Sequence, residues 1–528
     1  GDGAIETDRG IGTQIHGNVV ARGDRRVADR RNGQITVKRV RAIELEVGLR
    51  RARFDRDLAR GAVGELAAGG VGAGREEVAA AVVRRALVDV GAARSAAAVV
   101  ARRAVAAGEA ASVVGAGGER VAAAVVRRAL VDVGDLTVLV DALFGTGLKN
   151  PVQGVYLKAV EWLNLQSSPV VAVDIPSGID ASTGRVMGTA VNATLTVSFA
   201  FPKIGQVSYP GAGLTGELVV TDIGIPTQVS GQVLTDYLLV DADEARRLLP
   251  VRNSDGHKGT FGHLLVVAGS TGKCGAAVMA AESGLRAGAG LVTLACPQSV
   301  QPGIASRLTE VMTAPLSDFR GEANLNALGH LLSLTEGKQA LAVGPGLGLG
   351  KETGDLVRHL IEDSELPIVV DADALAALCG HLNIIEGQLD RQMVLTPHPG
   401  EMARLSGLSV TEIQADRFRV ARDFAMQNGV VLVLKGARTL IASPDGHVRI
   451  NTTGHAGLAS GGMGDVLTGL IGSLIAQGLT AFDAATLGVY LHGFAADRLQ
   501  SSFGDAGLLA TDVMREIPAA RQALAKEA

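Results

Sequence analysis

The first 134 residues of this 528-residue chain lack proline, cysteine, methionine, tyrosine and tryptophan, and their one aromatic residue is Phe54. The same segment holds 22 arginines against a single lysine, Lys38. A packed core needs large apolar side chains, so this composition argues against an ordinary globular domain. All 16 prolines occur at Pro151 or later, and the sequence changes character near residue 134.

This segment also contains an internal repeat. Val78–Gly91 and Val121–Gly134 are the same 14 residues, VAAAVVRRALVDVG, at an offset of 43. Such a period occurs in helical solenoids, but alanine and valine leave little side-chain volume to bury between units. We favour the hypothesis that residues 1–134 are an anomalous Arg/Ala/Gly-rich segment, such as a frameshifted translation of a GC-rich gene. A disordered or helical low-complexity segment and a genuine repeat array are the alternatives.

Other absences limit the class of protein. The three cysteines, Cys274, Cys296 and Cys379, are too few and too widely spaced for a disulfide framework or a zinc site, which favours a reducing cytoplasm. No apolar run reaches the roughly 18 residues that span a bilayer, and the N-terminus has no signal-peptide pattern. With a net charge of −4, nucleic acid is not an expected partner.

After residue 134 the sequence is typical of an α/β protein. Helical stretches, such as Ala276–Ala287 and Gly354–Glu362, alternate with short apolar runs that resemble buried parallel strands. These runs are Leu136–Val140, Val170–Val173, Leu264–Ala268, Ala340–Val343, Ile368–Val370 and Val430–Leu434. The alternation predicts doubly wound sheets with ligands at the carboxyl ends of the strands.

A glycine-rich loop, HAGLASGGMGDV at residues 455–466, ends in one acid, Asp465, directly before a predicted apolar helix, Val466–Gln477. Amides at a helix start attract anions, and glycines let the backbone approach a phosphate. An aspartate there can take the proton of a hydroxyl that attacks a phosphoryl group. The loop indicates phosphoryl transfer to a small molecule, and a glycine-rich turn before a buried helix is the alternative.

Two earlier strands each end in an aspartate, Asp141 and Asp174, followed by small residues, Gly145-Thr146-Gly147 and Ser177-Gly178. Small residues leave amides open to phosphate, and carboxylate and hydroxyl oxygens suit a hard cation. The alternative for each aspartate is a cap on the following turn.

The segments VDALFGTGL (140–148) and VDIPSGIDASTG (173–184) resemble the second half of the NAD(P)H-hydrate epimerase domain, across residues 135–235. The resemblance implies a partial Rossmann-like domain that binds hydrated NAD(P)H and potassium, with Asp141 and Ser177 as potassium ligands. It implies these contacts of the hydrated cofactor: Gly145, Thr146, Gly147, Leu148, Lys149, Asn150, Pro151 and Asp174. The family's upstream Asn-Asn-Gly-Gly-Asp-Gly loop does not occur before Asp141, so we predict an impaired epimerase site.

Residues 236–528 carry six further motifs in order: KCGAAVMAAESGLRAGAGLVTL (273–294), GPGLGLG (344–350), VVDADAL (369–375), TPHPGE (396–401), LKGART (434–439) and NTTGHAGLASGGMGDVL (451–467). Together they resemble the ADP- or ATP-dependent NAD(P)H-hydrate dehydratases of the ribokinase-like superfamily. The implied reaction restores NAD(P)H from its S-hydrate.

Roles follow from that resemblance. Asp465 would be the general base or would orient the hydroxyl, and magnesium would lie between the nucleotide phosphates. The nucleotide would be held by Lys435, Gly436, Ala437, Arg438, Thr439, His455, Ala456, Gly457, Leu458, Ala459, Ser460, Gly461, Gly462, Met463 and Gly464. The hydrated cofactor would be held by Ala276, Gly346, His398, Pro399, Gly400 and Glu401. Asp371 and Asp373 are either a metal-binding pair or a strand-end cap and its exposed neighbour.

Two other functions stay open at this point. One is a ribokinase-like kinase for a small molecule such as a vitamin precursor, and the other is a non-catalytic nucleotide-binding relative. The TPHPGE motif and the epimerase-like segment favour the dehydratase, and the resemblance implies a homo-oligomer that requires ADP or ATP, Mg²⁺ and K⁺.

Overall fold

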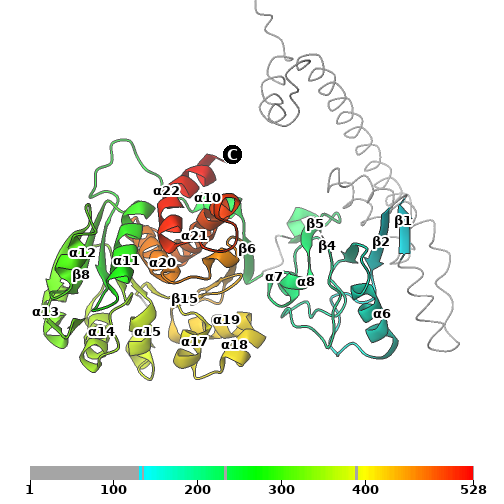
Figure 1. The fold of residues 1–528 in the computed structure, drawn as a ribbon, viewed down its shortest axis with the longest axis horizontal. Helices are drawn as coiled ribbons and strands as arrows, with labels where there is room; N and C mark the ends of the chain where they lie inside the picture. The colour runs from blue at the N-terminus through cyan, green and yellow to red at the C-terminus, as the bar shows by residue number, and fades with distance from the viewer. Residues whose placement is uncertain (1–129, 134–135, 231–234, 387–390, 527–528) are drawn as a thin grey trace, which may run out of the picture.

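The computed structural model of the chain describes residues 130–133, 136–230, 235–386 and 391–526 (Figure 1). The hypotheses about residues 1–129 therefore lie outside the described residues. The described chain forms two large sheets, one of five strands and one of ten.

The five-stranded sheet has the order β1-β2-β3-β4-β5. Its strands are β1 (Leu130–Val133), β2 (Leu136–Asp141), β3 (Val170–Val173), β4 (Leu195–Phe199) and β5 (Glu217–Thr221). Strands β2 to β5 are parallel, and β1 pairs antiparallel with β2. Helix α6 (Gly154–Asn164) connects β2 to β3, and the short helices α7 (Ile204–Val207) and α8 (Gly211–Leu214) lie between β4 and β5 in the chain.

The ten-stranded sheet has the order β6-β17-β16-β15-β14-β13-β12-β7-β8-β9. Its strands are β6 (Tyr237–Val240), β7 (His263–Val267), β8 (Leu291–Pro297), β9 (Met312–Leu316), β12 (Ala340–Val343), β13 (Ile368–Val370), β14 (Met393–Leu395), β15 (Val431–Leu434), β16 (Leu440–Ala442) and β17 (Val448–Asn451). From β15 to β9 all neighbours are parallel, and β16 runs antiparallel to both of its neighbours.

Alternating side chains of these strands supply two separate cores. Leu264 and Val266 of β7 belong to one core, whereas Leu265 and Val267 belong to the other. The first core includes α11 (Cys274–Ala287), α20 (Met463–Ala476), α21 (Ala481–Phe503) and α22 (Ala510–Lys526). The second includes α13 (Leu328–Thr335), α14 (Lys351–Asp363), α15 (Ala372–Leu378), α17 (Pro399–Ser406), α18 (Val410–Ala415) and α19 (Arg417–Asn428). Helices on both faces of a mostly parallel sheet confirm the predicted doubly wound α/β class.

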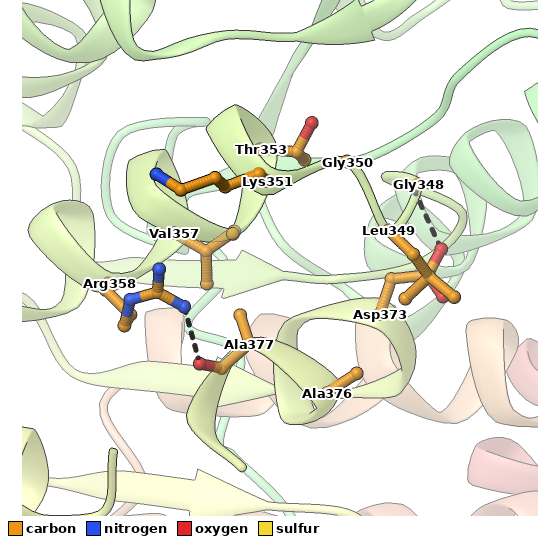
Figure 2. Close-up of a pocket in the computed structure, with 11 residues that line it drawn as sticks. Gly348, Leu349, Gly350, Lys351, Thr353, Val357, Arg358, Asp373, Ala376 and Ala377 are labelled. Atoms are coloured by element: carbon orange, nitrogen blue, oxygen red, sulfur yellow. Dashed lines mark hydrogen bonds between the residues drawn. The ribbon is translucent and has the colours of Figure 1, made fainter. Parts of the chain in front are cut away.

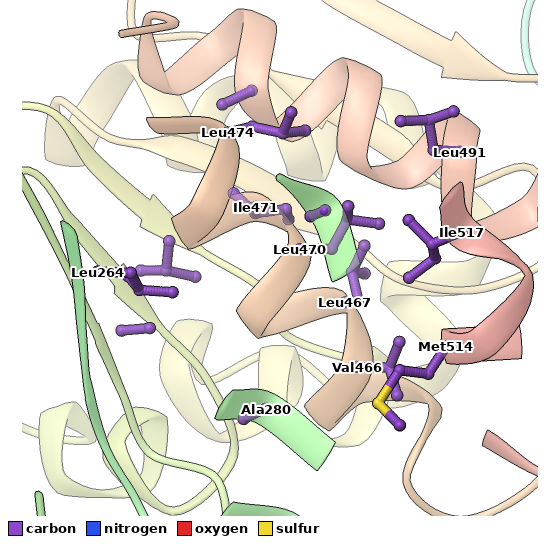
Figure 3. Close-up of a cluster of buried hydrophobic side chains, with 14 of the residues drawn as sticks. Leu264, Ala280, Val466, Leu467, Leu470, Ile471, Leu474, Leu491, Met514 and Ile517 are labelled. Carbon is purple, nitrogen blue, oxygen red and sulfur yellow. The ribbon is translucent and has the colours of Figure 1, made fainter. Parts of the chain in front are cut away.

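Helix α20 lies at the centre of the first core, where Val466, Leu470 and Leu474 pack among side chains of several other elements (Figure 3). Glycine permits a close approach to α11, because a Cβ on Gly469 would lie 1.9 Å from the carbonyl oxygen of Ala280. The predicted helix start at Val466 is wrong. Helix α20 begins at Met463 after Gly462, which has a φ of 90°, so Asp465 lies in its first turn.

The remaining elements connect these layers. They are α9 (Thr227–Ser230), α10 (Ala242–Arg247), α12 (Gln301–Ala305), β10 (Asp318–Phe319), β11 (Glu322–Ala323), η1 (Leu325–Ala327), α16 (Asn383–Glu386) and η2 (Ala456–Leu458). Within the described ranges, no helix combines the length and hydropathy needed to cross a bilayer.

Candidate active site

The candidate site lies where four parallel strands of the large sheet end. Strand β12 leads into Gly344, β13 into Asp371, β14 into Thr396 and β15 into Lys435. Parallel neighbours present their carboxyl ends at one edge of a sheet. The topology therefore brings the predicted motifs GPGLGLG, VVDADAL, TPHPGE and LKGART to the same edge.

A buried ion pair joins two of these motifs. The Nζ of Lys435 lies 2.8 Å from Oδ1 of Asp371, and the hydroxyl of Thr468 donates to the other carboxylate oxygen at 2.7 Å. Burial opposes the ionisation of Asp371, but Lys435 together with the hydroxyls of Thr468 and Thr396 outweighs it and holds the pKa of this carboxyl below its usual range. Burial lowers the pKa of Lys435, but the charges of Asp371, Glu401 and Asp465 together outweigh burial and raise it.

Asp465 lies beside this pair, in the first turn of α20. Burial raises the pKa of its carboxyl group to about 7, with a further contribution from the charge of Asp371, while Lys435 acts in the opposite direction. A carboxyl group with a pKa near neutrality can alternate between accepting and releasing a proton at physiological pH. This property suits a general base.

The start of α20 touches the ion pair directly. A Cβ on Gly464 would lie 3.3 Å from Nζ of Lys435 and 3.5 Å from Oδ2 of Asp371. The Met463 side chain is buried in the core. The N-terminal amides of a 14-residue helix thus lie next to a lysine and an aspartate, an arrangement that favours anions.

The loop before α20 is held by side chains of α21 and by its own histidine. Both carboxylate oxygens of Asp497 accept from the Gly454 amide, at 3.0 and 2.9 Å. His455 accepts from the Gly457 amide through Nδ1 at 3.1 Å, and its Nε2 lies 3.1 Å from the Ala496 carbonyl oxygen. These contacts order the loop and leave Ala456, Ala459, Ser460 and Gly461 exposed.

The second predicted nucleotide segment, 435–439, is the turn between β15 and β16. Gly436 and Ala437 are exposed at its tip. Gly436 has a φ of 145° and Arg438 a φ of 56°, so the backbone is bent through the left-handed region. Arg438 also donates to the Thr452 carbonyl at 2.7 Å, which links the turn to the segment that leads into the loop at His455.

The residues predicted to contact the hydrated cofactor divide into two groups. Ala276 and Gly346 are neighbours, because a Cβ on Gly346 would lie 3.0 Å from that of Ala276. Ser270 fixes this turn by donating to the Gly346 carbonyl oxygen at 2.7 Å.

The other group surrounds His398, which is the N-cap of α17. Its Nδ1 accepts from the amides of Gly400 at 3.0 Å and Glu401 at 3.3 Å, while Glu401 accepts from the His398 amide at 2.8 Å. This reciprocal capping places the ring proton on Nε2. The side chain is 52% exposed, and its Nε2 lies 3.5 Å from Oε1 of Glu401.

Two alternatives were predicted for Asp371 and Asp373, a metal-binding pair or a strand-end cap with an exposed neighbour, and the structure contradicts the cap. Asp371 makes no capping bond at α15 and is engaged by Lys435, and Asp373 is paired with Lys273 at 2.8 Å. No group of three or more potential metal-ligating side chains is found among the described residues. The two aspartates therefore bind separate lysines.

A cavity of about 210 Å³ adjoins the glycine-rich turn after β12. It lies between α14 and α15, with Asp373 at one end and Arg358 at the other (Figure 2). Asp373 accepts from the Gly348 amide at 2.9 Å. The lining does not include Asp465 or Lys435, so this cavity lies beside the candidate chemistry and does not contain it.

In the five-stranded sheet, Asp141 is fully buried at the end of β2. Its carboxylate accepts from the amide of Ser177 at 2.7 Å and from the hydroxyl of Ser177 at 2.6 Å. Burial raises the pKa of Asp141, and these hydrogen bonds only partly offset that effect. The predicted potassium ligands are thus in contact, and they form a pair of oxygen donors with one negative charge.

Asp174 ends β3 with a φ of 66° and forms an ion pair with Lys203. Lys203 also donates to the Phe199 carbonyl at 3.0 Å, so it holds the ends of two neighbouring strands. The predicted segment Gly145–Pro151 is the largely exposed turn between β2 and α6.

Lys203 and Thr468 have no assigned role among the sequence-based predictions. Lys203 lies within FAFPKIG (199–205), and Thr468 lies one helical turn after Gly464. That helical spacing could have indicated Thr468, since residues four apart share a helix face.

Two family models match the chain. One, described as NAD(P)H-hydrate dehydratase, matches residues 264–519, and one described as YjeF-related protein N-terminus matches residues 81–205. The second match begins inside the segment 1–134, and the domain boundary at residue 134 remains a prediction.

Individual proteins are similar over most of the chain. The bifunctional NAD(P)H-hydrate repair enzyme Nnr of Moorella thermoacetica is 46% identical over 382 residues, which cover 72% of each chain. The Escherichia coli enzyme of that name is 38% identical over 71% of this chain and 70% of its own. A Bacillus subtilis ADP/ATP-dependent NAD(P)H-hydrate dehydratase, co-crystallised with ATP/Mg²⁺, is 31% identical over 54% of this chain and 97% of its own, with a TM-score of 0.47. On the similarity of the first two, the chain belongs to the family of bifunctional NAD(P)H-hydrate repair enzymes.

Proposed function

We propose that residues 236–528 catalyse the dehydration of the S-epimer of NAD(P)H hydrate back to NAD(P)H, with ADP or ATP as the phosphoryl donor. One observation carries this proposal. Asp465, whose pKa is raised to about 7, lies in the first turn of α20 beside Lys435 and Asp371. A base, a cation and a set of helix amides at one point suit phosphoryl transfer to a hydroxyl.

In the first step, Asp465 takes the proton of the ring hydroxyl as that oxygen attacks the terminal phosphoryl group of the nucleotide. The bond between the phosphoryl group and the nucleotide breaks, and the amides at the start of α20 stabilise the negative charge. In the second step, the carbon–oxygen bond of the phosphate ester breaks and the neighbouring ring carbon loses a proton. The products are NAD(P)H, inorganic phosphate and a nucleotide with one phosphoryl group fewer.

We assign the two nucleotides to different strand ends. The turn 435–439 and the loop 455–464 would hold the phosphoryl donor, because both present exposed backbone beside Lys435. Ala276, Gly346 and the Nε2 of His398 would hold the hydrated cofactor. Gly346 follows β12 and His398 follows β14 at the same edge of the sheet, and Ala276 of α11 adjoins Gly346.

Magnesium would neutralise the nucleotide phosphates when bound. The described residues offer no cluster of three carboxylates or histidines to hold it alone. Asp371 and Asp373 already bind Lys435 and Lys273. The side chains thus fit an ion that arrives with the nucleotide and takes most of its oxygen ligands from phosphate and water.

We propose a potassium site at Asp141 and Ser177 in the five-stranded part. Among the described residues, only neutral donors contact the buried Asp141 carboxylate, so a monovalent cation would offset its charge. We also propose that epimerase activity is impaired, because the Asn-Asn-Gly-Gly-Asp-Gly loop is missing before Asp141. Potassium-dependent conversion of the R-hydrate at a rate comparable to the dehydratase would contradict this.

The decisive experiment supplies the purified chain with S-NADPH hydrate, Mg²⁺ and either ADP or ATP. Recovery of the absorbance of reduced nicotinamide, with one phosphate released per NADPH, supports the dehydratase. Accumulation of a stable phosphorylated product, detected by mass spectrometry, would indicate a small-molecule kinase instead. Binding of nucleotide without turnover would indicate a non-catalytic relative.

We further propose that the enzyme acts in the cytoplasm as a homo-oligomer. Free cysteines at Cys274, Cys296 and Cys379 support a reducing compartment. Light scattering of the purified chain tests the oligomeric state.

A further inference from the structure

Arg417 is a buried arginine at the start of α19, and it is 6% exposed. In the described part of the chain, no carboxylate lies within ion-pair distance of its guanidinium group. Burial lowers the pKa of Arg417 only to about 10, so the group stays charged at neutral pH. A buried, charged arginine is rare unless its hydrogen bonds are used, and those bonds show its role.

The partners of Arg417 are backbone carbonyls of the turn 434–438. Its Nη1 donates to the carbonyl oxygen of Ala437 at 2.7 Å, with that of Arg438 at 3.5 Å. Its Nη2 donates to the carbonyl oxygen of Leu434 at 3.0 Å, with that of Lys435 at 3.4 Å. The turn after β15 therefore wraps around the guanidinium group.

Glycine is required for this wrapping at Gly436. A Cβ there would lie 3.0 Å from Nη2 of Arg417, and the residue has a φ of 145°. The turn's strained backbone and the buried arginine thus fit each other closely. Removing the arginine would leave several inward-facing carbonyls without donors.

The amides of the same turn have the opposite orientation. In a planar trans peptide the N–H points away from the C=O of the same unit. Since the carbonyls of Lys435 and Ala437 face Arg417, the amides of Gly436 and Arg438 face outward. Neither of these amides donates to an acceptor in the described chain, and Gly436 is exposed.

We infer that Arg417 is a positioning residue for the adenine nucleotide. It holds the turn 435–439 in the shape that presents outward amides to the nucleotide, while touching no nucleotide atom itself. This inference rests on the proposed function. It goes further by assigning nucleotide affinity to a residue behind the turn.

The test compares ADP binding by two variants, Arg417→Lys and Arg417→Met, using calorimetry on the full chain. Lysine keeps a buried cation and protects folding but loses the planar fork, and methionine removes the charge at similar volume. We expect the Kd for ADP to rise by roughly tenfold or more in both, because several hydrogen bonds to a charged group are lost. The KM for S-NADPH hydrate at saturating ADP should stay within about twofold of the wild-type value.

Arg419→Met is the matched control, because Arg419 is on the same helix but 60% exposed and paired with Asp416. It should bind ADP like the wild type. A folded Arg417→Lys protein with wild-type ADP affinity overturns the inference, as does an equal loss of affinity for ADP and for the hydrate. If the wild-type chain does not bind ADP, the proposed function is wrong. If the wild-type chain binds ADP and the Arg417 variants bind it equally well, only the role of Arg417 is rejected.

Discussion

Lys435 and Asp371, 64 residues apart in sequence, form a buried ion pair with a separation of 2.8 Å between Nζ and Oδ1. The pair lies against the first turn of α20, where Gly464 leaves room for it. The two charges act on Asp465 in opposite directions, and the carboxylate of Asp371 raises the pKa of Asp465 more than Lys435 lowers it. The pair therefore helps to set the pH at which Asp465 works as a base.

The first prediction is a pH dependence. Asp465 has its pKa raised to about 7, and it accepts a proton only in its ionised form, so kcat/KM should be constant at high pH and fall below about 7. The fall should approach tenfold per pH unit. Asp371→Asn removes a negative charge near Asp465 and leaves Lys435 with Glu401, at 3.7 Å, as its ion-pair partner, so the midpoint should move to lower pH. Asp363→Asn, an exposed acid at the end of α14, should not move it. A midpoint unchanged in Asp371→Asn would contradict the assignment.

The second prediction concerns the base itself. Asp465→Asn keeps the shape of the side chain and removes its basicity, so kcat should fall by about a hundredfold or more. The KM for ADP should change little, since the amides at the start of α20 remain. Steady-state kinetics with the S-hydrate measure both values. A variant with wild-type turnover would rule out Asp465 as the base.

The third prediction tests the close contact at the start of α20. In Gly464→Ala the new methyl group would lie 3.3 Å from Nζ of Lys435. The lysine must shift, and we expect kcat to fall by roughly tenfold, since small displacements of positioned groups are costly. The matched control is Gly329→Ala in α13, where nothing lies within 4 Å of the added methyl group. The control should keep full activity and gain up to about 1 kcal/mol of stability. Equal activity of the two variants would show that the contact has no catalytic role.

The fourth prediction separates two roles of His398. His398→Ala removes the cap of α17 and should lower the free energy of unfolding by about 1 kcal/mol, whereas His398→Asn should retain the cap. If Nε2 binds the hydrated cofactor, both variants should raise the KM for the S-hydrate. Thermal denaturation and steady-state kinetics on the same samples distinguish the roles. If His398→Asn has the wild-type KM for the S-hydrate, His398 only caps α17 and does not bind the hydrated cofactor.

Three of the four strands at the site could be predicted almost to the residue. Ala340–Val343 and Ile368–Val370 match β12 and β13, Val430–Leu434 begins one residue before β15, and β14 (Met393–Leu395) has no predicted counterpart. In the five-stranded sheet, Val170–Val173 matches β3. Each of these runs is fully apolar and ends at a turn or a charged residue. A parallel strand buried on both faces has this pattern, so its ends are marked by composition alone.

The start of α20 could not be predicted in this way. Met463 and Gly464 precede Asp465 within a glycine-rich run, and glycine has a low helix propensity, which masks the first turn. The ion pair between Lys435 and Asp371 could not be predicted from the sequence either. It depends on the order β15-β14-β13 in the sheet, and no short-range pattern encodes contacts between strands that are separated by another strand.

Helix α20 has a consequence for motion in the enzyme. All but two of its residues, Gly464 and Asp465, are buried, and it packs against α11, α21 and the sheet. An element enclosed on every side opens only when the domain unfolds, so its amides should be among the slowest to exchange with deuterium. The proposed base is therefore anchored at the start of a helix that the core of the domain holds in place. We therefore expect the exposed turns around it, at Gly436–Ala437 and Ser460–Gly461, to move when substrates enter and products leave.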